Sequence, residues 1–267
     1  MEATAIIQAR MGSTRLPGKV LKPLAGHPML WHVVQRVRAT PGLAEVVVAT
    51  PESSENDAIR AFCGREGIAV FSGSEEDVLD RYYQAARAFA ADPVVRVTSD
   101  CPLVDPSLIG RLLILFGEGG YDYAGIAIGG AAKAFGVNGY PSGLDAECLS
   151  FATLERAWRE ATLQPEREHV TPYIWCNKDR FRNGMHVPAE DWSDTRLSVD
   201  EPEDFTVAEC IYEALYREGE PAFGFDDVTR FLAAHPEVVE LNRRFIGKEK
   251  YRDLWDAAAP GDGEPLP

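Results

Sequence analysis

Short apolar runs alternate with helix-like segments along the first half of the chain. Four runs are apolar over most of their length, as buried strands are: residues 4–9, 45–50, 69–71 and 94–98. The segments after them predict helices at residues 29–38, 57–64, 75–90 and 107–116. This alternation favours an α/β fold, with a Rossmann-like, mostly parallel sheet and helices on both of its faces.

The pattern loosens in the second half. Residues 117–143 are rich in Gly and Tyr and indicate a small irregular or antiparallel insertion. A short strand is expected at 197–199, and helices are expected at 151–161, 168–177, about 202–217 and 225–234. We expect residues 1–256 to form one domain and residues 257–267, which are rich in Ala, Pro and Gly, to form a disordered tail.

The chain is acidic overall but begins with a basic segment. Its 27 Lys and Arg against 42 Asp and Glu leave a net charge of −15, which argues against nucleic acid as a partner. No acidic residue lies between Glu2 and Glu45, whereas that stretch holds Arg10, Arg15, Lys19, Lys22, Arg36 and Arg38. Such clustering predicts a local anion site. Arg36 and Arg38 lie on the predicted helix at 29–38 and are expected to face solvent.

The remaining composition indicates a cytoplasmic protein without a membrane partner. The first residues lack the pattern of a signal peptide, and no apolar run approaches the ~20 residues that span a bilayer. The five Cys are widely spread and show no zinc-ligand spacing, which favours reduced thiols.

The loop after the first strand carries the features of a phosphate site. Ligands of parallel α/β sheets bind at the carboxyl ends of the strands. Gly12 and Gly18 let the backbone approach a phosphate closely, and Arg10, Arg15 and Lys19 can add charge-assisted hydrogen bonds. The glycine spacing fits neither a Walker A loop nor a dinucleotide fingerprint. A solvated surface loop is the alternative.

Two aspartates follow predicted strands and are candidates for binding Mg²⁺, which takes one or two carboxylates together with phosphate oxygens and water. They are Asp100 and Asp200. Asp100 could instead be a turn residue before Pro, and Asp200 could form a capping box with Glu203. Asp105, followed by Pro106, predicts an ordinary helix start.

The string IQARMGSTRLPGK at residues 7–19 resembles the signature of the cytidylyltransferases that activate acidic sugars, among them the 3-deoxy-manno-octulosonate and acylneuraminate enzymes. The similarity continues through LKPLAGHPML at residues 21–30 and covers roughly residues 4–255. Residues 71–81, 140–145 and 167–171 are similar to one branch, the SpsF-like proteins of spore-coat and surface polysaccharide synthesis. The resemblance implies a fold of the nucleotide-diphospho-sugar transferase type.

The resemblance also implies roles for individual residues. Arg10, Lys19, Asp100 and Asp200 would be catalytic; the first two would hold the triphosphate, and the two aspartates would bind Mg²⁺. The nucleotide would contact Ala9, Arg10, Gly12, Ser13, Arg15, Lys19, Ser72, Gly73, Arg81, Thr98 and Ser99. The acceptor would contact Ser142, Gly143, Asp145, Glu168 and His169.

Some of these roles have alternatives. Arg81 could form a surface salt bridge, and Ser74 is expected to cap the next helix with Asp77 at its third position. The octulosonate enzymes carry a cytosine-contacting Gln where Thr98 or Ser99 falls. The resemblance favours CTP as donor, but UTP stays open because neither residue is Gln here.

The implied activity is a Mg²⁺-dependent transfer of a nucleotide, with CTP favoured, to an anionic sugar-like acceptor with release of pyrophosphate, in surface polysaccharide biosynthesis. By analogy, elements in residues 120–195 would bind the acceptor and form a homodimer. The alternatives are a glycosyltransferase that consumes a nucleotide sugar and a non-catalytic nucleotide-binding module. The Arg/Lys loop favours a triphosphate and hence the first function.

Overall fold

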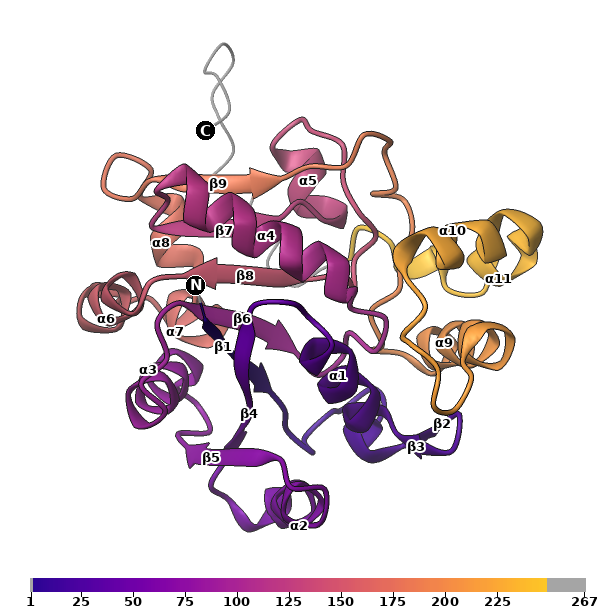
Figure 1. Cartoon of the computed structure of the whole chain (residues 1–267), viewed down its shortest axis with the longest axis horizontal. Helices are drawn as coiled ribbons and strands as arrows, with labels where there is room; N and C mark the ends of the chain where they lie inside the picture. The colour runs from indigo at the N-terminus through magenta and orange to yellow at the C-terminus, as the bar shows by residue number, and fades with distance from the viewer. Residues whose placement is uncertain (1, 249–267) are drawn as a thin grey trace.

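A computed structural model describes residues 2–248 (Figure 1). Its centre is a seven-stranded sheet in the order β5-β4-β1-β6-β8-β7-β9. The strands are β1 (Ala3–Gln8), β4 (Leu43–Pro51), β5 (Ala69–Gly73), β6 (Val94–Thr98), β7 (Tyr123–Ile126), β8 (Ala146–Leu149) and β9 (Asn183–His186). All neighbours pair in parallel except β8, which is antiparallel to both β6 and β7. The predicted mostly parallel sheet is confirmed.

Helices cover both faces of this sheet, as predicted (Figure 1). Along β1, Ile7 packs into one core and Ile6 into the other, because successive side chains of a strand point to opposite faces. The first core includes α1 (Met29–Arg38), α2 (Asp57–Arg65), α4 (Pro106–Gly119) and α9 (Pro202–Leu215). The second includes α3 (Val78–Ala88), α6 (Phe151–Glu160) and α8 (Pro172–Cys176).

The shorter elements lie mostly at the edges of this framework. A two-stranded ribbon joins β2 (Pro23–Leu24) to β3 (His27–Pro28). The remaining helices are α5 (Gly129–Ala134), α7 (Gln164–His169), α10 (Phe225–Ala234) and α11 (Pro236–Glu240), with 3₁₀ turns η1 (Lys19–Leu21), η2 (Ser54–Asn56) and η3 (Arg243–Phe245). Within residues 2–248 no helix is long and apolar enough to cross a bilayer. The expected tail at 257–267 and the end of the predicted domain lie outside the described residues.

Helix starts show one predicted cap and one that is displaced. Asp105 caps α4 as predicted, and its Oδ1 accepts hydrogen bonds from the backbone N–H groups of Ser107 (2.6 Å) and Leu108 (3.2 Å). Ser74 does not cap α3, because that helix begins at Val78. Asp77 is the cap instead, and Ser74 stabilises the turn before it by accepting from the Asp77 N–H (3.0 Å).

Two predicted elements differ from those observed. Residues 197–199 do not form a sheet strand. They run extended between two loops, and their backbone bonds to Ser142 O (2.7 Å) and Asp100 O (2.8 Å). The helix expected at 168–177 is two short helices, α7 and α8, because the chain breaks at Val170, with a positive φ of 73°, just before Pro172.

Arg36 was expected to face solvent and is buried, with 4% of its surface exposed. Its guanidinium donates hydrogen bonds to the backbone oxygens of Val104 (2.7 Å) and Phe223 (2.8 Å). It therefore links α1 to the loop before α4 and to the chain before α10. Arg38, two residues later on the opposite side of the helix, is exposed as expected.

Candidate active site

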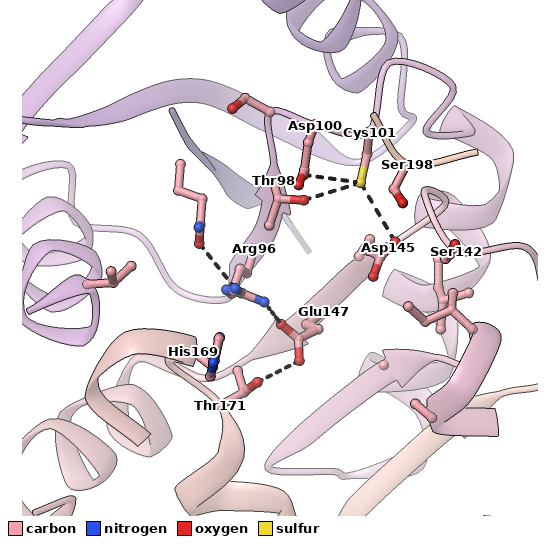
Figure 2. Close-up of a pocket in the computed structure, with 18 of the residues that line it drawn as sticks. Arg96, Thr98, Asp100, Cys101, Ser142, Asp145, Glu147, His169, Thr171 and Ser198 are labelled. Atoms are coloured by element: carbon pink, nitrogen blue, oxygen red, sulfur yellow. Dashed lines mark hydrogen bonds and ion pairs between the residues drawn. The ribbon is translucent and has the colours of Figure 1, made fainter. Parts of the chain in front are cut away.

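A cavity of about 460 Å³ lies at the carboxyl ends of β1 and β6, and Figure 2 shows the side chains along one part of its wall. Most of the predicted site residues line it, although they come from six separate stretches of the chain. They are Ala9, Arg10, Gly12, Ser13, Arg15, Lys19, Arg81, Thr98, Ser99, Asp100, Ser142, Asp145, Glu168, His169 and Asp200. The fold thus brings together the nucleotide and acceptor residues that the sequence predicted.

The first loop is held in place by its neighbours in the sheet. The N–H of Ser99, after β6, donates to Gln8 O (3.0 Å), so the ends of β1 and β6 stay side by side. The N–H of Met11 donates to Oδ1 of Asn56 (2.9 Å), and Asn56 is only 1% exposed. Gly18 adopts a left-handed conformation (φ 67°) and starts the turn η1, which directs Lys19 toward the cavity.

Lys19 joins the two predicted metal ligands. Its Nζ lies 2.9 Å from Oδ1 of Asp200 and 3.7 Å from Oδ2 of Asp100, and it donates to Val199 O (2.5 Å). Burial alone would lower the pKa of this ammonium, but the facing charges of Asp100 and Asp200 outweigh burial and raise its pKa. Lys19 is therefore a fixed positive charge at the centre of the site.

Asp200 is surrounded by cations. Besides Lys19, the Arg15 guanidinium lies 3.2 Å from its Oδ1 and that of Arg196 lies 3.0 Å from its Oδ2. Burial raises the pKa of Asp200, but Lys19, Arg15 and Arg196 together outweigh burial and lower its pKa. Asp200 is thus ionised at neutral pH, as a metal ligand must be.

The buried carboxylate of Asp204 orders the backbone around Asp200. Asp204 is 1% exposed, and its Oδ2 accepts from the backbone N–H groups of Asp200 and Glu201 (2.9 Å each). Its two carboxylate oxygens also form a bidentate ion pair with the Arg196 guanidinium (2.9 Å each). The predicted capping box of Asp200 with Glu203 is therefore wrong. Glu201 is the cap of α9, and Asp204 is its partner.

Asp100 and Asp200 offer carboxylate oxygens, the type of ligand that a magnesium ion prefers. Both carboxylates direct an oxygen at one cation, the Lys19 ammonium, which shows that the two can share a positive charge. Mg²⁺ commonly takes two carboxylates and completes its shell with phosphate oxygens and water. Within residues 2–248, no group of three or more His, Cys, Asp or Glu side chains is placed to hold a metal ion.

Asp145, a predicted acceptor residue, projects into the cavity from just before the start of β8 (Figure 2). Its Oδ2 accepts from the Gly143 N–H (2.6 Å). The Cys101 Sγ lies 3.7 Å from both this oxygen and Oδ1 of Asp100, and its single S–H can donate to either one. Burial raises the pKa of Asp145 to about 6, and the negative charges of Asp100 and Glu147 act in the same direction. The Gly143 N–H and the positive charge of Arg96 act in the opposite direction, but burial outweighs them.

Glu147 and Arg96 are site residues that the sequence analysis missed. They form an ion pair across β6 and β8, and Oε1 of Glu147 also accepts from the hydroxyls of Tyr123 (2.6 Å) and Thr171 (2.7 Å). All four residues line the cavity. The signal was available for Glu147, because it lies two residues after Asp145 and side chains at that spacing share one face of a strand.

Three predicted site residues do not line the cavity: Ser72, Gly73 and Gly143. Ser72 and Gly73 end the edge strand β5, and a β-carbon on Gly73 would lie 3.2 Å from Cγ of Arg81. Arg81 itself lines the cavity and is 2% exposed, so it does not form a surface salt bridge. Burial lowers the pKa of its guanidinium. The same β-carbon on Gly73 would lie 2.9 Å from Cε1 of Phe71, so Gly73 makes room for both Phe71 and Arg81.

Comparison with known proteins agrees with this geometry. The model of the family described as Cytidylyltransferase matches residues 4–217. The chain belongs to the cytidylyltransferase family. The spore coat polysaccharide biosynthesis protein SpsF of Bacillus subtilis is 34% identical to this cytidylyltransferase over 215 residues, which are 78% of the chain and 85% of SpsF. The resemblance inferred from the first loop is confirmed.

Two further proteins are similar to this cytidylyltransferase. The 3-deoxy-manno-octulosonate cytidylyltransferase of Geobacter metallireducens is 41% identical over 113 residues, which are 42% of this chain and 44% of that protein. A solved cytidylyltransferase from Leptospira borgpetersenii superposes with a TM-score of 0.80 at 28% identity, over 90% of this chain and 97% of that one. This cytidylyltransferase is accordingly a nucleotidyltransferase with the expected fold.

Proposed function

We propose that this cytidylyltransferase transfers CMP from CTP to an acidic sugar-like acceptor, with Mg²⁺ bound and pyrophosphate released. The observation that carries the proposal is the meeting of the basic first loop with Asp100 and Asp200 around Lys19, at one end of a cavity. The other end of the cavity is lined by further polar side chains, among them Ser142, Asp145 and His169. These could bind a second substrate.

The nucleotide half supplies charge and shape. Arg10, Arg15 and Lys19 line the cavity as cations for the triphosphate, and backbone at Gly12 and Ser13 can approach the phosphates closely. Buried Arg81, whose guanidinium donates to Ser74 O, is the candidate for contacting the base. Thr98 and Ser99 are the candidates for contacting base or ribose.

Asp100 and Asp200 are the candidates for holding Mg²⁺. A bound Mg²⁺ would neutralise phosphate charge while the acceptor oxygen attacks the α-phosphorus and pyrophosphate departs. The residues of this chain position both substrates and supply fixed positive charge, which is how enzymes accelerate most transfers of this type. Arg196 and Asp204 keep the Asp200 carboxylate in place.

The acceptor half would bind the sugar-like acid. Ser142, Asp145, Glu168 and His169 line it, and Gly143 orients Asp145 from behind. One relative is named for 3-deoxy-manno-octulosonate and another for spore coat polysaccharide biosynthesis. These names support an acidic sugar as acceptor and a role in surface polysaccharide synthesis. The homodimer and the cytoplasmic location stay predictions.

The test is the thermal stability of the protein with CTP, UTP, ATP and GTP, each with and without Mg²⁺. CTP at a hundred times its dissociation constant should stabilise the fold by about 2.7 kcal/mol, which raises Tm by roughly 5–10 °C. We expect this shift with CTP and Mg²⁺, followed by pyrophosphate release when 3-deoxy-manno-octulosonate is added.

Other outcomes would redirect the proposal. A shift with UTP alone would keep a nucleotidyltransferase activity and overturn the choice of cytidine. A shift with a nucleotide sugar, and with none of the four triphosphates, would favour a glycosyltransferase. CTP binding without pyrophosphate release from any acidic sugar tested would favour a non-catalytic nucleotide-binding module.

A further inference from the structure

The C-terminal part of the chain, beyond the residues matched by the family, packs beside α9. Helices α10 and α11 lie against α9 at one end of the molecule (Figure 1). Val238 of α11 is 6% exposed and belongs to the first core, the one that includes α1, α2, α4 and α9. The chain then turns through η3, and Lys248, six residues after Asn242, lines the active-site cavity. The segment therefore runs from the core to the site.

Asn242, between α11 and η3, is the link between this segment and the site. It is 2% exposed, and its Nδ2 donates to Arg196 O (2.9 Å) and to Oδ1 of Asp204 (2.9 Å). Both partners are acceptors only, so the amide nitrogen must point toward them. Asn242 is thus the one side chain in the described part of the chain that bonds both the backbone of Arg196 and the carboxylate of Asp204.

These two partners are the residues that hold Asp200. The Arg196 guanidinium bridges Asp204 and Asp200, at 2.9 Å and 3.0 Å, and Asp204 accepts from the N–H of Asp200. Movement of the Arg196 backbone or of the Asp204 carboxylate would therefore turn the Asp200 carboxylate. Residues that orient a metal ligand in this way typically change metal affinity 10–100-fold when they are replaced.

We propose that Asn242 is a positioning residue of this cytidylyltransferase. It holds Arg196 and Asp204 in the arrangement that presents Asp200 to the metal ion of the nucleotide, so the segment after α10 is part of the active site. This inference rests on the proposed function, because it assumes that Asp200 binds Mg²⁺ together with CTP.

The test measures CTP binding to Asn242→Ala by isothermal titration calorimetry at 25 °C, across a series of Mg²⁺ concentrations. We expect the Mg²⁺ concentration for half-maximal CTP affinity to rise about tenfold, while CTP affinity without Mg²⁺ changes little. Val238→Ala is the matched control. It removes two buried methyl groups from the same segment and should lower Tm, yet leave the Mg²⁺ requirement as in the wild type. Should Asn242→Ala fail to fold, Asn242→Ser serves in its place.

The results separate this inference from the function on which it rests. If the wild type binds CTP in a Mg²⁺-dependent way and the Asn242 variant has the same Mg²⁺ requirement, the positioning role is wrong and the proposed function stands. If Val238→Ala raises the Mg²⁺ requirement as much as Asn242→Ala, the effect is one of general stability and the positioning role is also wrong. If the wild type does not bind CTP with Mg²⁺, both proposals fail.

Discussion

The carboxylates of the site differ in the charges that surround them. Asp200 is within ion-pair distance of Lys19, Arg15 and Arg196, and its pKa is lowered. Asp145 lies only a short way along the cavity wall, yet burial raises its pKa to about 6. Burial of an ionised carboxylate is costly, and for Asp145 the nearby N–H and cationic groups do not offset that cost, so its ionised form destabilises the fold.

Replacing Asp145 should therefore stabilise the protein at neutral pH. Its pKa is ordinarily near 3.8 in an unfolded chain and is about 6 in the fold. Between these values the native state binds more protons than the unfolded state, so stability falls as pH rises and the ionised group costs up to about 3 kcal/mol above pH 6. We expect Asp145→Asn to raise the free energy of unfolding by about 2 kcal/mol at pH 7.5.

Urea denaturation at several pH values measures this effect. The gain of Asp145→Asn over the wild type should shrink as pH falls from 6 toward 4, because the wild-type carboxyl is then neutral too. A gain that is the same at both ends of this range, or a loss of stability at pH 7.5, would contradict the explanation.

At the scale of elements, the site depends on how closely two loops approach. Gly143 has a positive φ of 100° and lies against the extended segment before Asp200. A β-carbon there would lie 2.3 Å from the backbone N of Ser198 and 2.4 Å from the carbonyl carbon of Leu197. Backbone atoms cannot move aside cheaply. Gly143 thus sets the spacing between the Asp145 loop and the Asp200 segment.

Gly143→Ala should lower the free energy of unfolding by about 3 kcal/mol or more, through strain and collision together. Gly136 is the matched control, because it also has a positive φ (68°) but has no atom within 4 Å of a built β-carbon. Gly136→Ala should cost only about 1 kcal/mol. Equal losses for the two variants in urea denaturation would show that φ alone, and not the close approach, is responsible.

At the scale of the whole molecule, buried polar side chains connect the C-terminal elements to the rest of the fold. Asn242 is one link and Arg36 is another, since its guanidinium bonds to the chain before α4 and before α10. Both lie in the core or at its edge, where an unpaired polar group is expensive. The C-terminal elements are thus bound to the family fold by polar contacts as well as by packing.

Arg36→Ala should lower the free energy of unfolding by about 3 kcal/mol, because it leaves two buried carbonyl groups without a donor and opens a cavity. Arg38 lies two residues away, on the opposite side of α1, is exposed, and bonds only to Gly67 O (3.2 Å) among the described residues. Arg38→Ala should change stability by no more than about 0.5 kcal/mol. A small loss for Arg36→Ala in urea denaturation would show that the link does not matter for the fold.

The sequence by itself determined the framework and one side of the site. The buried strands β1, β4 and β6 appear as apolar runs, because a strand covered on both faces needs apolar side chains at nearly every position. The first loop and Asp100 follow those strands directly, so their place at the carboxyl ends of the sheet could be predicted. The family resemblance could also be found in the sequence, because it rests on one continuous string at residues 7–19.

Only the tertiary structure decided what surrounds Asp200 and Glu147. Asn242 and Arg196 are 46 residues apart, and Arg96 and Glu147 are 51 apart. A hydrogen bond between residues so far apart in the chain produces no periodic pattern of hydrophobic and polar residues. The local sequence therefore cannot predict such a bond. The extended segment at 197–199 and the buried Arg36 were wrongly predicted for the same reason: their environment is made by loops and helices from elsewhere in the chain, which local sequence does not record.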